Sequence, residues 1–158
     1  MSIAIVPGSF DPITEGHLNI VKRALTLYDE VVVAVMNNAA KTYMFDMDAR
    51  AEMARRAVAG LNGVRVVADS GMLVDLFDRI GAEAIVKGVR NGEDLIYEQE
   101  MADYNLAHNP RAKTVLLEAD ASLDSLSSTR VREHILQGKI PAGLPDGVLA
   151  YLSEKGVL

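Results

Sequence analysis

The sequence predicts an α/β fold built on a five-stranded parallel sheet, and three observations indicate it. Short β-like runs alternate with amphipathic runs, as in strands joined by right-handed helical crossovers. Residues 31–36 form a continuous apolar run, which is typical of a strand buried on both faces. The 158 residues contain no repeat, low-complexity tract or linker, so we expect a single domain over residues 1–158.

Five short apolar runs are the expected strands of this sheet. The first is ended by the turn-forming pair Pro7-Gly8, and the second is the continuous run described above. The expected strands are residues 3–6, 31–36, 64–68, 84–86 and 114–117.

Six amphipathic runs are the expected helices. In the first, Ile20, Val21, Ala24 and Leu27 share one face, and before the second Asp46 stands in the position of an N-cap. The expected helices are residues 18–27, 49–61, 73–80, 94–107, 128–137 and 146–154.

In open sheets of this kind, ligands bind beyond the carboxyl ends of the strands. The segments that follow the strands are therefore candidates for a site before any motif is considered. They are residues 7–17, 37–45, 70–73, 87–94 and 119–129.

Composition excludes several classes of function. A formal net charge of −6 argues against general binding to nucleic acid or to a membrane surface, although a few convergent cations can still hold phosphates. The absence of cysteine excludes disulfides, thiolate zinc sites and a cysteine nucleophile, and it fits the cytoplasm. His17, His108 and His134 are too scattered to suggest a metal cluster. We expect neither a signal peptide nor a membrane span.

The first loop carries a candidate phosphate site. Residues 8–17 read Gly-Ser-Phe-Asp-Pro-Ile-Thr-Glu-Gly-His, which is neither a dinucleotide-binding glycine motif nor a Walker loop. Gly16 permits close approach of an anion to a helix start, and His17 can donate a hydrogen bond to it. Standing alone, such a pair is more often a turn followed by a solvated residue.

A second candidate lies near the C-terminus, where residues 126–132 read Leu-Ser-Ser-Thr-Arg-Val-Arg. Hydroxyl and N–H groups that open a helix suit phosphate oxygens. Alone, this segment is more often a Ser/Thr helix cap with exposed arginines.

Three cations follow the second and fourth strands. Lys41 lies in one of these segments, and Lys87 and Arg90 lie in the other. A lone loop lysine is usually solvated, but the fold brings these two segments to one cleft.

The string that ends in Thr14-Glu15-Gly16-His17 resembles the His-x-Gly-His signature of the nucleotidyltransferase superfamily. The variant with Thr in the first position is typical of bacterial phosphopantetheine adenylyltransferases. Three further segments resemble that family, and the resemblance covers nearly the whole chain. They are Asn-x-x-Lys-x-x-x-Phe from residue 38, Lys-Gly-Val-Arg over residues 87–90, and the helix from Asp94 to Asn105. Ser-Ser-Thr-x-Val-Arg over residues 127–132 resembles the superfamily's Ile-Ser-Ser-Thr-x-Ile-Arg motif.

The resemblance implies a Rossmann-like, doubly wound sheet of order 3-2-1-4-5 with helices on both faces. It implies transfer of AMP from ATP to 4′-phosphopantetheine, with His17 stabilising the transition state and Mg²⁺ accompanying ATP. The implied acceptor-binding residues are Ser9, Lys41, Leu73 and Lys87. The implied ATP-binding residues are Ser9, Phe10, His17, Gly88, Val89, Arg90, Glu98, Leu123, Asp124, Ser125, Leu126, Ser127, Ser128, Thr129 and Arg132. A homohexamer and feedback inhibition by coenzyme A are also implied.

The chain departs from the family pattern at several positions. The family usually has an aromatic residue where this chain has Leu123-Asp124-Ser125, a third serine at Thr129, Lys-Glu at Arg132-Glu133, and Phe at Leu95. The C-terminal motif also leans towards adenylyltransferases that act on pyridine mononucleotides. Two alternatives therefore stay open: a nicotinate or nicotinamide mononucleotide adenylyltransferase or a cytidylyltransferase, and a non-catalytic nucleotide-binding module.

Overall fold

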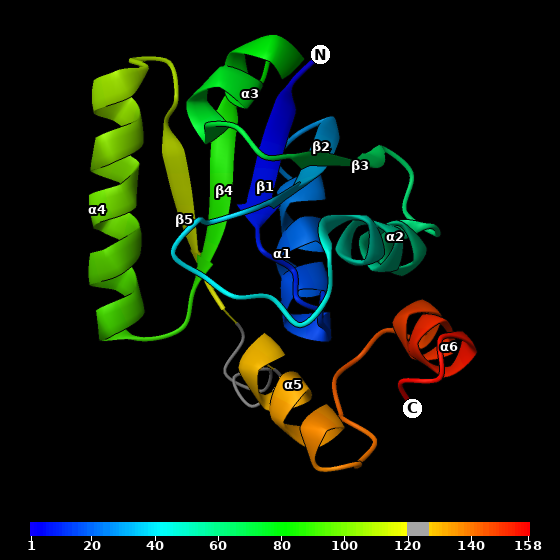
Figure 1. The fold of residues 1–158 in the computed structure, drawn as a ribbon. Coiled ribbons are helices and arrows are strands. Elements are labelled where there is room, and N and C mark those ends of the chain that lie inside the picture. Colours follow the sequence, from blue (N-terminus) through cyan, green and yellow to red (C-terminus); the bar gives the residue numbers. More distant parts are fainter. Residues whose placement is uncertain (120–126) are drawn as a thin grey trace.

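The computed structural model describes residues 1–119 and 127–158. A parallel sheet forms its centre, and helices flank the sheet (Figure 1). In chain order, the elements are β1 (Ile3–Gly8), α1 (Glu15–Leu25), β2 (Glu30–Met36), α2 (Met47–Val58), β3 (Val64–Asp69), α3 (Leu73–Ile80), β4 (Ala84–Val89), α4 (Gly92–His108), β5 (Thr114–Glu118), α5 (Ser128–Leu136) and α6 (Asp146–Glu154).

The strand order is β3-β2-β1-β4-β5, which confirms the order that the family resemblance implied. β1 pairs with β2 over its whole length, from Ile3 to Gly8. It pairs with β4 only at Ala4 and Ile5. The carboxyl ends of β1 and β4 are therefore unpaired with each other, at the point where the order of the strands reverses. This is where open α/β sheets bind ligands.

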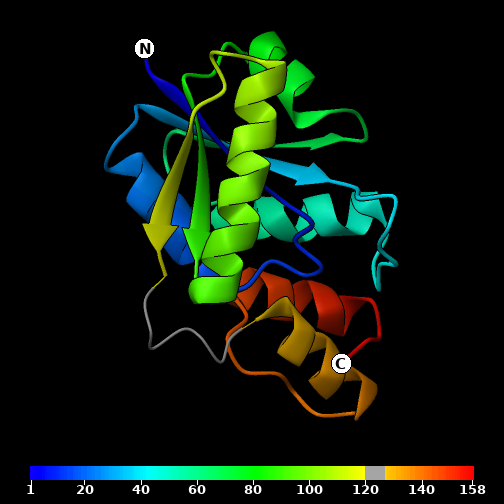
Figure 2. The same cartoon turned by 90° about the vertical axis from the view of Figure 1, so that its left-hand side faces the viewer.

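The sheet buries both of its faces, and alternate residues of each strand point to opposite sides. On one face, Ala4 and Val6 of β1 pack with α1, α2 and α6. On the other face, Ile5 packs with α3, whose Phe77 is fully buried. α4 lies on this second side, over β4 and next to α3 (Figure 2).

Several element boundaries differ from those expected. α1 begins at Glu15 rather than at residue 18, because the Thr14 side chain caps it. β4 continues to Val89 rather than ending at residue 86, because Lys87, Gly88 and Val89 pair with β5. The expected N-cap of α2 is confirmed, since Asp46 Oδ1 accepts a hydrogen bond from Ala49 N at 2.8 Å.

The last two helices lie beyond the carboxyl ends of the strands in both views (Figures 1 and 2). α6 packs against α2, and Arg56 forms an ion pair with Glu154 at 3.0 Å. Among the described helices, none combines the length and the apolar character that crossing a membrane requires.

Candidate active site

A cavity of about 340 Å³ opens where the carboxyl ends of β1 and β4 separate. Its walls come from the β1–α1 loop, the segment after β2, the end of β4, α4 and the start of α5. Most of the residues expected at the site line it: Ser9, Phe10, His17, Lys41, Lys87, Gly88, Arg90, Glu98, Ser127, Ser128, Thr129 and Arg132.

The remaining expected residues lie elsewhere. Val89 is 8% exposed and is not part of the cavity wall, because its side chain belongs to the buried part of β4. Leu73 lines a smaller cavity of about 70 Å³ that shares Lys87 and Glu98 with the main one. Leu123, Asp124, Ser125 and Leu126 lie outside the described residues.

His17 is fixed by the start of its own helix. Its Nδ1 accepts a hydrogen bond from Thr14 N at 3.1 Å, and its backbone N donates to Thr14 Oγ1 at 3.4 Å. A neutral imidazole that accepts at Nδ1 carries its proton on Nε2. The ring of Phe10 meets His17 edge-on, with the ring centroids 5.0 Å apart. The capping geometry therefore selects one tautomer, with Nε2–H as a donor.

The surroundings of His17 also decide its charge. Burial, together with the positive charges of Arg90 and Lys87, lowers the pKa of the imidazole to about 4, and burial is the largest of these causes. At neutral pH the ring is therefore uncharged and can donate a hydrogen bond from Nε2.

Phe10 adopts a backbone conformation that is rare for a residue with a side chain. Its φ angle is 49°, in the left-handed region that costs roughly 1–2 kcal/mol for L-residues. This conformation accompanies the burial of its ring, which is 3% exposed, against His17. Strain in this loop coincides with the packing that orients the imidazole.

Carboxylates hold the cations of the cavity in place. Lys87 Nζ lies 3.2 Å from Glu98 Oε1, and Glu98 is 7% exposed. Asp94 Oδ2 accepts from Arg90 N at 2.9 Å and lies 3.9 Å from Arg90 Nε. Among the described residues, no carboxylate lies within 4.0 Å of the ammonium of Lys41. Lys41 therefore contributes a positive charge that forms no ion pair within the described part of the chain.

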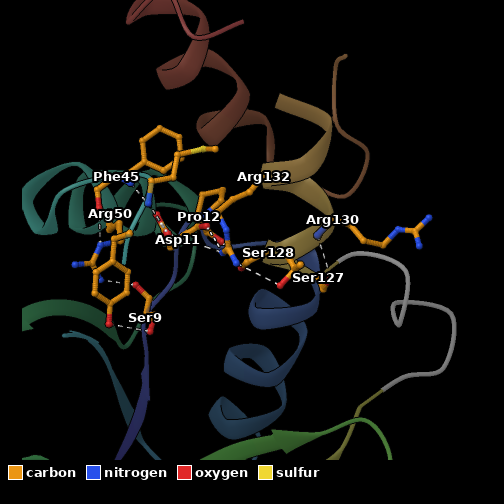
Figure 3. A network of polar contacts seen from close by, with 12 residues as sticks. Ser9, Asp11, Pro12, Phe45, Arg50, Ser127, Ser128, Arg130 and Arg132 are labelled. Atoms are coloured by element: carbon orange, nitrogen blue, oxygen red, sulfur yellow. Dashed lines mark hydrogen bonds and ion pairs between the residues drawn. The ribbon is translucent and has the colours of Figure 1, made fainter. Parts of the chain in front are cut away.

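The hydroxyls at the start of α5 bond within the protein (Figure 3). Ser127 Oγ accepts from Arg130 N at 3.2 Å, and Ser128 Oγ donates to Pro12 O at 2.7 Å. Thr129 Oγ1 accepts from Arg132 Nη2 at 3.3 Å. A helix start leaves its first N–H groups without helical partners, so any anion at this end meets backbone donors as well.

The comparisons with known proteins agree with this geometry. Residues 5–134 match the cytidylyltransferase-like family. The chain is 44% identical to a phosphopantetheine adenylyltransferase of Heliobacterium modesticaldum, with 98% of this chain and 93% of that protein covered. It is 45% identical to the protein of that name from Nocardioides sp., with 98% of each covered. For the protein of that name from Limosilactobacillus fermentum, the identity is 38% and the coverage 98% and 92%.

The chain belongs to the phosphopantetheine adenylyltransferase family. The family that the motifs indicated is thereby confirmed. The individual site residues stay predictions, and most of them line the one cavity.

Two polar residues at or near this cavity were not expected from the sequence. Asp11 is 3% exposed, and its carboxylate accepts from Met44 N at 2.9 Å and from Phe45 N at 3.0 Å. Arg50 is 1% exposed and donates to the loops on either side of the cavity. The spacing of Arg50 with Met53 and Ala54, at three and four residues, is the signal that could have placed it on the buried face of its helix.

The described residues offer no ready-made metal cage. They contain no group of three or more His, Asp or Glu side chains placed to hold an ion. The acids of the cavity, Asp11, Asp94 and Glu98, each lie beside a cation. Such a donor set suits a cation that arrives on phosphates and keeps its water, as Mg²⁺ does with nucleotides.

Proposed function

We propose that this chain transfers the adenylyl group of ATP to 4′-phosphopantetheine, giving dephospho-coenzyme A and pyrophosphate. The observation that carries the proposal is one cavity that collects His17, Lys41, Lys87, Arg90 and the start of α5. Anchored cations and helix-start donors suit two phosphate-bearing ligands. The names of the curated relatives support the same reaction.

The chemistry needs positioning more than proton transfer. A phosphate oxygen of the acceptor attacks the α-phosphorus of ATP, a new P–O bond forms, and the bond to pyrophosphate breaks. The attacking phosphate is already mostly ionised at neutral pH, so no general base is required. His17 fits the role of a donor to the α-phosphoryl oxygens, because its Nδ1 is occupied by Thr14 and Nε2 carries the proton.

Lys41 and Lys87 are the proposed ligands of the acceptor phosphate. They reach the same cavity from β2 and β4, and Glu98 keeps the Lys87 ammonium in place before a ligand arrives. Ser9 lines the cavity between them. The smaller cavity beside Lys87, with Leu73 in its wall, fits the start of the pantetheine chain.

The opposite wall is the proposed ATP side. Arg90, Gly88 and the first turn of α5 would meet the nucleotide, with Arg132 near the triphosphate. We further propose that Mg²⁺ accompanies ATP on its phosphates. Its charge would add to that of the protein cations and stabilise the leaving pyrophosphate.

A competition assay tests the acceptor. The protein is given ATP with equal phosphopantetheine and nicotinate mononucleotide, and the products are separated by chromatography. Dephospho-coenzyme A is the expected main product. A dinucleotide as the main product would show that the acceptor is a pyridine mononucleotide. If no acceptor led to release of pyrophosphate, a non-catalytic nucleotide-binding module would be favoured. Replacing ATP by CTP tests the nucleotide in the same assay.

We also propose a homohexamer in which α4 faces another copy. The only buried residues of α4 are polar, Glu98 and Asn105. Its large apolar side chains are exposed instead: Leu95, Ile96, Tyr97, Met101, Tyr104 and Leu106. A surface helix of a globular protein normally buries its apolar side chains and exposes its polar ones. An apolar surface on another copy would explain why α4 has the opposite arrangement. Sedimentation of the wild type and of Ile96→Lys tests the proposal, since the variant should shift to smaller species.

Coenzyme A is the proposed feedback inhibitor, and the cytoplasm the proposed location. Coenzyme A contains the pantetheine chain and the adenosine of the proposed product, so it can occupy both sides of one cavity. If coenzyme A inhibits the enzyme and a higher concentration of phosphopantetheine relieves the inhibition, the proposal is supported. If neither substrate relieves the inhibition, coenzyme A binds outside the cavity.

A further inference from the structure

The most deeply buried charge near the cavity belongs to Arg50 of α2. Its side chain is 1% exposed, and within residues 1–119 and 127–158 all of its hydrogen-bond acceptors are neutral. Its Nε donates to Phe45 O at 3.0 Å, and its Nη1 donates to Ser9 O at 2.8 Å and to Met36 O at 3.2 Å. Its Nη2 donates to Asn37 Oδ1.

These acceptors come from three separate stretches of chain (Figure 3). Ser9 belongs to the β1–α1 loop, Met36 ends β2, and Phe45 directly precedes the N-cap of α2. The segment of residues 37–45, which carries Lys41, therefore begins and ends on one guanidinium. The ring of Tyr43 from the same segment covers the guanidinium face at 4.0 Å.

Burial of a charge without a counter-ion is costly, and an apolar side chain would fill such a site at less cost. The planar guanidinium offers what an apolar group lacks, namely five N–H donors in a fixed geometry. Here those donors fix the two ends of the Lys41 segment to the loop that carries Ser9.

We propose that Arg50 is a positioning residue for the acceptor, which sets where Lys41 stands relative to Ser9 and the cavity. This proposal rests on the proposed transfer to a phosphorylated acceptor. Arg50 lines neither cavity, and four of its five N–H donors bond to the protein, so it acts through the segment that it holds. Its loss would let the Lys41 segment move and leave the ATP wall of the cavity unchanged.

The test compares Arg50→Met with Arg55→Met, a matched change of an arginine on the same helix. Arg55 is 53% exposed and lies 3.8 Å from Glu52, a surface pair of little consequence. For Arg50→Met we expect kcat/KM for phosphopantetheine to fall by about 100-fold, while the dissociation constant of ATP stays at its wild-type value. Arg50→Lys should recover only a small part of this loss, because an ammonium cannot span the four acceptors.

Two readouts separate positioning from a general loss of structure. The melting temperature reports folding, and hydrogen exchange should quicken in residues 37–45 of Arg50→Met but not in Arg55→Met. If the variant is folded and its acceptor kinetics match those of Arg55→Met, the proposal is overturned. Equal losses for ATP and acceptor would also overturn it, since they indicate a structural role only.

Asn37→Ala keeps the test open if Arg50→Met does not fold. It removes one acceptor of the guanidinium at an exposed position and should lower kcat/KM for phosphopantetheine by about tenfold, with ATP binding intact. An unchanged value for a folded Asn37→Ala would overturn the proposal. The wild type is assayed in parallel: if it adenylylates no acceptor, the proposed function fails and this inference fails with it, whereas an active wild type with indifferent variants overturns the inference alone.

Discussion

The segment of residues 37–45 and the start of α5 line the cavity from different sides, and they are held in different ways. The first has almost no regular structure, yet Asp11 and Arg50 bond to the backbone at both of its ends. The second is a regular helix, but it is tied to the β1–α1 loop mainly through Ser128 and Arg132. At this site, a segment without regular secondary structure is therefore held in place by more hydrogen bonds to its backbone than a helix start is.

Both segments meet at Asp11. Its carboxylate holds the first segment, and its carbonyl oxygen accepts from Arg132 Nη1 at 2.8 Å (Figure 3). The two sides of the cavity thus share one buried anchor, and substitutions can test each side separately.

The largest effect is expected at His17, which lies between the two segments. His17→Ala should lower kcat by about 10²–10³-fold, the usual result of removing one preorganised donor to a transition state. ATP affinity should change little. Rapid-quench kinetics and equilibrium ATP binding check this, with His108→Ala, an exposed histidine, as the control. Equal losses in ATP binding and turnover would contradict the assigned role.

Lys87→Ala tests the acceptor side. Removing this ammonium takes away a charge-assisted contact to the acceptor phosphate and leaves the buried Glu98 without its partner. We expect kcat/KM for phosphopantetheine to fall about 100-fold, with ATP binding retained. Lys113→Ala, which changes an exposed lysine, serves as the control. A matching loss of ATP affinity would show that Lys87 does not distinguish the two sides.

Arg132→Ala tests the weaker attachment on the ATP side. The variant loses both the contact to Asp11 O and the positive charge near the proposed triphosphate, so KM for ATP should rise about tenfold. The choice of acceptor should not change. Arg130→Ala, on the exposed side of the same helix, should behave as the wild type. Steady-state kinetics with varied ATP distinguish the two variants.

The last prediction concerns the pH dependence of stability rather than turnover. The folded protein lowers the pKa of His17 from its ordinary value of 6.5 to about 4, chiefly by burial. As pH falls from 6.5 to about 4, the unfolded chain takes up a proton that the folded site refuses, so the contribution of His17 to the free energy of unfolding falls over this window and is constant above it. The loss relative to His17→Asn should be roughly 3 kcal/mol. Parallel urea titrations of both proteins at several pH values would measure it, and parallel pH curves would contradict the shifted pKa.

The sequence was sufficient to predict the architecture and most of the cavity wall. Alternating patterns identified the strands and helices, and the resemblance supplied the strand order that the structure confirms. Motif residues such as His17 and Lys87 reach the cavity because they follow, or end, strands that meet at the switch point. The end of β4 was placed too early, since pairing with β5 rather than local composition extends it to Val89.

The buried residues that hold the cavity wall in place, Arg50 and Asp11, were harder to predict. Arg50 stands in a helix rich in charged residues, where an arginine usually faces solvent. Asp11 stands in a loop, where a carboxylate also usually faces solvent. Their partners are backbone groups far away along the chain, such as Ser9 for Arg50 and Met44 for Asp11, and no spacing rule encodes such contacts. Long-range bonds to the backbone become visible only in three dimensions.

Gly88 links the width of the cavity to the packing of the core. A Cβ at this position would lie 2.9 Å from Cγ1 of Ile20, a buried residue of α1, the helix that also carries His17. A single added methyl group would push on Ile20, and through it on the helix that presents the imidazole. Ile20 and Gly88 both line the cavity, so the space that a ligand finds there depends on how closely α1 packs against β4, as well as on the motif side chains themselves.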